Sequence, residues 1–157
     1  MKKEFKQAIE KYGVAEIGVY FKNKVKPSER PLLRRSKECY EALKNSWDDD
    51  TLDIQETFRV MLLSKGCRLL GIYDLSRGSM TGTLVDVRMI LIAAMATGAT
   101  TLILSHNHPS GNLRPSFSDI GLTRKVKEAA RLFDIEVMDH LIISREGYLS
   151  MAEEGAL

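Results

Sequence analysis

The hydrophobic pattern of the chain predicts strands and helices that alternate along the sequence. Every second residue is apolar at Ile17, Val19 and Phe21, which is typical of a strand, here over residues 14–25. An unbroken apolar run at 101–104 predicts a central strand that is covered on both faces. Apolar runs bounded by turn residues predict further strands at 58–63 and 68–75, which form a hairpin, at 135–143 and at 148–151.

Helices are predicted between these strands from their capping residues. Asp86 is a suitable N-cap for a helix that Gly98 ends. Ser116 opens another helix, and Ser36 is placed to cap a short one. The alternation of strands and helices favours an α/β (α+β) fold with three layers, in which helices flank one mixed sheet, and residues 1–157 are expected to form a single domain.

The composition is that of an ordinary globular protein. The length of 157 residues suits one domain, and 44% hydrophobic with 28% charged residues excludes disordered and collagen-like chains. The net charge of +2, from 23 basic and 21 acidic residues, argues neither for nor against a nucleic-acid partner. Function must therefore be sought in local motifs.

Cysteine usage and the absence of targeting signals suggest a cytoplasmic protein. Cys39 and Cys67 lie far apart and form no Cys-x-x-Cys pair, which fits two free thiols in a reducing compartment. No apolar segment follows the charged residues at the start, so no signal peptide is expected. The most apolar stretch, 89–104, is too short to span a membrane and is interrupted by Thr97, Gly98, Thr100 and Thr101.

Two histidines follow the predicted central strand and suggest a metal site. His106 and His108 alternate on the strand, so their side chains point to the same side with backbones about 7 Å apart. Asp119 lies at the start of the next helix, which returns close to the end of that strand. Two imidazoles and a carboxylate would leave the fourth position of a zinc ion to water, as in catalytic zinc sites. Ser116 and Asp119 also fit a capping box, which needs no metal.

These residues resemble a known family. His106-x-His108, seven residues, Ser116, two residues and Asp119 match the JAMM (MPN-plus, JAB) metalloprotease motif without a gap. The longer string from His106 to Asp119 resembles the bacterial RadC branch, including the loop residues Asn107, Pro109, Ser110, Gly111 and Pro115. Two later segments also resemble that branch: Leu122-Thr123 and Asp139-His140-Leu141-Ile142. The resemblance covers about two thirds of the chain, from Gln55 onward, and leaves residues 1–54 as an atypical extension with a strand, a basic loop and a helix.

The resemblance implies a JAMM fold related to cytidine deaminases and one zinc ion held by His106, His108 and Asp119. It implies that Glu56 acts as the base and then the acid, and that Ser116 steadies the oxyanion. The alternative for Glu56 is a solvated charge after an acidic turn. His140 is expected to be a core histidine bonded to a neighbour.

The implied activity is hydrolysis of an amide or isopeptide bond in an unidentified peptide or protein substrate. Asn107 is expected to secure the backbone of the loop.

Two other enzyme classes are disfavoured. A cytidine deaminase needs His-x-Glu and Pro-Cys-x-x-Cys, and neither occurs here. An HNH-type nuclease disperses its motif over a hairpin and a helix, so the letters His-Asn-His alone carry little weight.

The alternative function is a non-catalytic module that binds DNA or protein. The RadC name is associated with DNA repair, but residues 1–50 show none of the helix-hairpin-helix module expected in full-length members. Residues 22–37 hold seven basic residues and one acid, and basic residues recur in the helix after Ser116. Such residues could contact phosphates, or simply form solvated faces. The candidate DNA contacts are Lys22, Lys24, Lys26, Arg34 and Arg35.

Overall fold

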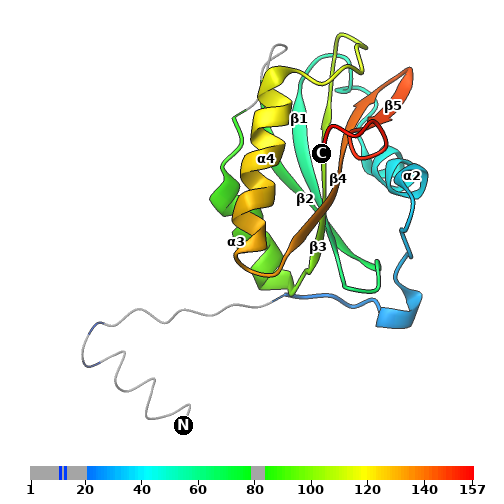
Figure 1. Cartoon of the computed structure of the whole chain (residues 1–157). Coiled ribbons are helices and arrows are strands. Elements are labelled where there is room, and N and C mark those ends of the chain that lie inside the picture. Colours follow the sequence, from blue (N-terminus) through cyan, green and yellow to red (C-terminus); the bar gives the residue numbers. More distant parts are fainter. Residues whose placement is uncertain (1–10, 12, 14–20, 79–83) are drawn as a thin grey trace.

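The computed structural model describes residues 11, 13, 21–78 and 84–157. After a short 3-10 helix, η1 (Pro27–Glu29), the elements are α2 (Ser36–Ser46), β1 (Thr57–Leu63), β2 (Leu69–Arg77), α3 (Val87–Thr97), β3 (Thr101–Asn107), α4 (Phe117–Arg131), β4 (Glu136–Ser144) and β5 (Gly147–Ser150) (Figure 1). The predicted hairpin, the central strand and the two later strands are confirmed.

One mixed sheet runs through the structure in the strand order β2-β1-β3-β4-β5. Neighbouring strands are antiparallel except β3 and β4, which are parallel and joined by the crossover helix α4. All seven residues of the central strand β3 are buried. The α/β prediction is therefore confirmed.

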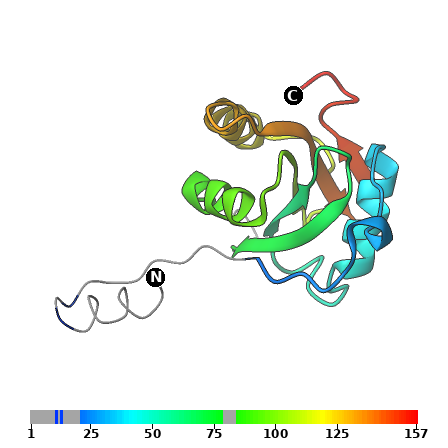
Figure 2. The same cartoon turned by 90° about the horizontal axis from the view of Figure 1, so that it is seen from below.

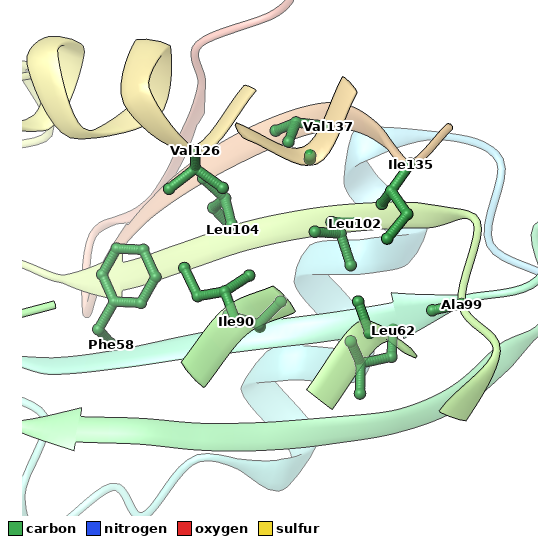
Figure 3. Close-up of a cluster of buried hydrophobic side chains, with 12 residues drawn as sticks. Phe58, Leu62, Ile90, Ala99, Leu102, Leu104, Val126, Ile135 and Val137 are labelled. Atoms are coloured by element: carbon green, nitrogen blue, oxygen red, sulfur yellow. The ribbon is translucent and has the colours of Figure 1, made fainter. Parts of the chain in front are cut away.

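Helices cover both faces of the sheet and make three layers. α3 and α4 lie on one face and α2 on the other (Figure 2). Alternate residues of β1 serve the two cores: Phe58 and Leu62 pack with α3 and α4, as Figure 3 shows, whereas Met61 and Leu63 pack with α2. This alternation follows from the two-residue period of a strand and explains why β1 is apolar throughout.

The crossover brings the end of β3 and the start of α4 to one edge of the sheet. A helix that returns over the sheet must begin near the strand end it leaves, which Figure 1 shows at the top of the molecule. Ligand sites of α/β folds typically lie at this edge, beyond the carboxyl ends of parallel strands.

Local capping fixes two helices as predicted. The Asp86 side chain accepts a hydrogen bond from the Arg88 backbone N–H, and Gly98 ends α3 in the left-handed conformation with φ 68°. Ser116 is the N-cap of α4. The N-cap of α2, however, is Arg35 rather than Ser36. The Ser36 hydroxyl donates instead to Asp139 Oδ2 at 3.0 Å and ties α2 to β4.

The strand expected at 14–25 is not found where it can be checked. Residues 14–20 lie outside the described part of the chain, and residues 21–25 form no strand. The Asn23 side chain accepts a hydrogen bond from the Val25 backbone N–H at 2.8 Å. This local bond occupies the Val25 N–H, which could otherwise pair with a neighbouring strand. The alternation of apolar residues alone therefore did not establish a strand at 21–25.

Candidate metal centre

Three side chains with metal-binding atoms converge at the end of β3. His106 belongs to β3, His108 is the first residue after β3, and Asp119 lies in the first turn of α4. One ligand atom from each residue lies within 4.8 Å of the others. His106 Nε2 is 2.9 Å from His108 Nε2 and 3.4 Å from Asp119 Oδ1, and His108 Nε2 is 3.7 Å from Asp119 Oδ2.

Ser116 orients the carboxylate of Asp119 while capping α4. The Ser116 backbone N–H and hydroxyl donate to Asp119 Oδ2 at 2.7 and 2.6 Å, and the Asp119 N–H donates to Ser116 Oγ at 3.1 Å. Capping box and metal-site geometry are thus compatible, because Oδ2 satisfies the cap and Oδ1 faces His106. The two interpretations that the sequence left open coincide in one structure.

Each histidine is held through its other ring nitrogen. His108 Nδ1 lies 2.5 Å from the carbonyl oxygen of Asn112, and His106 Nδ1 lies 2.8 Å from His140 Nε2. A carbonyl oxygen can only accept, so His108 carries a proton on Nδ1 and its Nε2 is free to bind a metal when the ring is neutral.

The site attracts positive charge. Burial raises the pKa of the Asp119 carboxyl, but its contacts with His106 and His108 and the hydrogen bond from Ser116 together outweigh burial and hold that pKa well below its usual range. The hydrogen bond to Asp119 in turn raises the pKa of His108 against the lowering effect of burial, and the nearby charge of Glu56 raises it further. An ionised carboxylate therefore stands beside two imidazoles, which suits either a proton or a metal cation.

The spacing of these atoms fits a zinc ion. Two ligand atoms on a tetrahedral zinc, each about 2.0–2.1 Å from the ion, lie about 3.3 Å apart. The separations given above, from 2.9 to 3.7 Å, span that value. Two imidazoles and one carboxylate leave a fourth position open, the arrangement of catalytic rather than structural zinc sites.

Glu56 lines the same cavity as the three candidate ligands. This cavity measures about 510 Å³, and Ser116 and Arg114 also line it. Phe58 pairs with His106 across the β1–β3 ladder, so Glu56 lies two residues before that pair and on the same face of the sheet. The structure thus brings the sequence-predicted acid to the sequence-predicted ligands from a distant part of the chain.

His140 lies behind His106 and is not among the converging ligand atoms. Its ring is fully buried. His140 Nε2 lies 2.8 Å from His106 Nδ1, and His140 Nδ1 lies 2.6 Å from the Thr123 hydroxyl oxygen. Burial lowers the pKa of His140 well below the usual value, so the ring is neutral. A core histidine bonded to a neighbour was predicted, but its two partners were not. The only sequence signal for Thr123 was its place in a segment that resembles the family.

The basic residues predicted to meet DNA lie away from this cavity. Lys22, Lys24, Lys26, Arg34 and Arg35 are all exposed, and none of them lines the cavity. The segment 31–33 lies against the turn between β1 and β2, where Leu32 forms a β-bridge with Arg68. That turn is at the opposite end of β1 from Phe58 and His106. Among the described residues, no helix has the length and apolar character needed to cross a membrane.

Comparison with known proteins identifies the domain. A family model described as "RadC-like JAB domain" matches residues 33–156, which includes α2 as well as the sheet and the candidate metal centre. The chain is 43% identical over 100 residues to a UPF0758 protein of Flavobacterium johnsoniae and 45% identical over 104 residues to one of Porphyromonas gingivalis. These matches cover 64% and 66% of this chain but 44% and 46% of the relatives.

The chain thus spans less than half the length of the curated relatives it matches. Because the family model covers well over half of the chain, including every residue of the candidate metal centre, the chain belongs to the RadC-like JAB domain family.

Proposed function

We propose that this protein is a zinc-dependent hydrolase that cleaves an amide or isopeptide bond with a metal-activated water. The observation that carries the proposal is the convergence of His106, His108 and Asp119 in one cavity that Glu56 also lines. Three protein ligands with an open fourth position, beside a carboxylate in the same cavity, are the parts that such hydrolysis requires.

Each residue has a distinct task in this scheme. His106, His108 and Asp119 would hold one zinc ion, which when bound lowers the pKa of its water to about 7 and polarises a carbonyl group. Glu56 takes the proton of the attacking water and returns it to the departing amine. A carboxylate is suited to both transfers because it can gain and lose a proton within one catalytic cycle.

Ser116 is proposed to steady the oxyanion of the reacting carbonyl group. Its hydroxyl lines the cavity but donates to Asp119 Oδ2 at 2.6 Å. The proposed role therefore requires the hydroxyl to exchange that hydrogen bond for one to the substrate.

The substrate itself is proposed to be a peptide or protein. A cytoplasmic location is supported by the free thiols of Cys39 and Cys67.

The test compares the wild-type protein with Glu56→Gln. Both proteins are loaded with zinc and incubated with a library of internally quenched peptides that contain α-amide and lysine ε-amide bonds. We expect the variant to retain zinc and its fold but to lose hydrolysis, because a neutral amide cannot take up the proton. Glu41→Gln, an exposed acid on α2, is the matched control and should keep full activity. Normal cleavage by Glu56→Gln would rule out this base.

The second candidate function is a non-catalytic module that binds DNA or protein. Its support is the basic stretch at 22–37, in which every basic residue except Arg30 is exposed and no residue lines the cavity of the candidate metal centre. This function predicts binding that does not depend on zinc, whereas the hydrolase predicts chemistry that does.

A further inference from the structure

A row of buried hydrogen bonds leads from the middle of α4 to the candidate metal centre. Thr123 Oγ1 lies 2.6 Å from His140 Nδ1, and His140 Nε2 lies 2.8 Å from His106 Nδ1. The exposed fractions of Thr123, His140 and His106 are 2%, 0% and 1%. Water therefore cannot replace any partner in this row, and the protons must be shared among the three side chains.

The Thr123 hydroxyl determines the direction of the row. Its oxygen also lies 2.6 Å from the backbone carbonyl oxygen of Asp119, one helical turn earlier. Two oxygens this close need a proton between them, and a carbonyl oxygen has none to give. The single hydroxyl proton therefore points to Asp119, which is the usual backbone bond of a threonine in a helix. The Met151 sulfur, at 3.9 Å, is a much weaker acceptor.

The remaining protons follow in turn. Since the Thr123 hydroxyl donates to Asp119, its oxygen must accept from His140, which places a proton on His140 Nδ1. His140 is fully buried and contacts a hydroxyl and an imidazole, so it is neutral and its Nε2 is an acceptor. His106 then donates from Nδ1, and its Nε2, which faces His108 and Asp119, carries a lone pair.

We propose that Thr123 and His140 are positioning residues that hold His106 in the tautomer able to bind the metal. In the reverse arrangement Thr123 would donate to His140, His140 to His106, and the proton would sit on His106 Nε2, where the ion belongs. The same hydroxyl holds the backbone of Asp119, so Thr123 links two of the three ligand residues. The inference rests on the proposed zinc site, but the tautomers it assigns exist without metal.

Nitrogen NMR of the metal-free protein tests the assignment directly. The chain has three histidines, so a long-range nitrogen–proton spectrum shows only three rings and can be assigned by substitution. At mildly alkaline pH we expect His106 and His140 each to carry the proton on Nδ1 and to have an unprotonated Nε2. A proton on Nε2 of His106 or of His140 would overturn the proposal, whatever the zinc content.

Zinc affinity tests the consequence. Thr123→Val keeps the branched shape but removes the hydroxyl, and Thr123→Ser restores it. With competition against a chromogenic chelator, we expect Thr123→Val to bind zinc about 10–100-fold more weakly and to shift the His140 ring signals. Thr123→Ser should stay within the wild-type order of magnitude and keep the wild-type tautomers.

Wild-type affinity in Thr123→Val would overturn the positioning role. Altered tautomers in Thr123→Ser would do the same even if the valine variant failed to fold. A wild-type protein that takes up no zinc would refute the proposed hydrolase, while the NMR spectrum would still decide the tautomers.

Discussion

The side chain of Asn107 is hydrogen-bonded to the backbone on both sides of Glu56. Its Oδ1 accepts from the Thr57 N–H at 2.7 Å, and its Nδ2 donates to the carbonyl oxygens of Gln55 at 2.9 Å and Leu52 at 2.6 Å. Asn107 stands between two of the candidate ligands, His106 and His108, in the sequence, so one strand end presents both the candidate ligands and the support for the proposed base. Asn107 therefore secures backbone, as predicted, but the prediction named the wrong segment: its partners are Leu52, Gln55 and Thr57, at the entry to β1, and not the loop that follows β3.

Removing the Asn107 amide should destabilise the fold and displace Glu56. Asn107 is fully buried, so Asn107→Ala leaves three backbone groups without their partner. We expect the free energy of unfolding to fall by about 3 kcal/mol, which chemical denaturation measures. Any hydrolysis should fall further than zinc content does, because the lost hydrogen bonds hold the backbone around Glu56 and none of them is made to a ligand residue.

Asn23→Ala is the matched control for that change. Among the described residues, its side chain makes one long-range hydrogen bond, to the Leu70 carbonyl oxygen at 3.2 Å, and one local bond, from the Val25 N–H, and it is partly exposed. We expect a loss of about 1 kcal/mol or less. Equal losses in the two variants would show that Asn107 has no special role in supporting Glu56.

Removal of either histidine should abolish the metal site. His106→Ala or His108→Ala leaves two ligands, too few for a stable zinc site, so zinc bound to the purified protein should fall from about one equivalent to near zero. Asp119→Asn should weaken binding less, because an amide oxygen can still coordinate but carries no charge. Elemental analysis after dialysis measures the zinc content of the three variants. Zinc retained by both alanine variants would show that the metal binds at another site.

The stability of the metal-free protein should fall as the pH rises above about 6.5, the ordinary histidine pKa. Asp119 raises the pKa of His108 in the folded protein. Protonated His108 therefore contributes stability that is complete below the unfolded-chain pKa and is lost as the pH passes through the folded pKa. In saturating zinc the trend should reverse, since zinc binds only neutral imidazole and its affinity increases with pH.

Chemical denaturation across this pH range, once with chelator and once with zinc, measures both trends. Asp119→Asn provides the control, because it removes the negative charge of the partner that is the main cause of the raised His108 pKa. A decline that persists unchanged in metal-free Asp119→Asn would exclude His108 as its origin.

Duplex DNA should bind weakly at most. The net charge is only +2, and the exposed basic residues lie away from the cavity. If binding occurs, neutralising Lys22, Lys24, Lys26, Arg34 and Arg35 together should lower the affinity and flatten its salt dependence. Titration of a labelled duplex with and without chelator measures this. Unchanged binding by that variant would direct attention to the exposed basic residues of α4, which are Arg124, Lys125, Lys127 and Arg131. Tight binding that does not change when chelator is added would favour the non-catalytic module.

Elements whose ends depend on nearby residues could be predicted from the sequence. Asp86 and Gly98 bound α3, and Ser116 begins α4, because a cap needs only a side chain and backbone groups within a few positions. The convergence of His106, His108 and Asp119 was accessible for the same reason, since one strand end, one loop and one helix start hold all three. Alternation at 14–25 predicted a strand wrongly for residues 21–25, because a strand also needs a neighbouring strand to bond with.

The surroundings of the candidate metal centre, by contrast, depend on contacts between distant parts of the chain. Asn107 reaches Thr57 across 50 positions, and His106 reaches His140 across 34. Such contacts depend on the strand order β2-β1-β3-β4-β5, which places the starts of β1 and the ends of β3 and β4 together at one edge of the sheet. No local pattern encodes that order, because it arises from burying both faces of the sheet at once. The partner of each buried nitrogen, and with it the protonation of the ligands, follows from that packing.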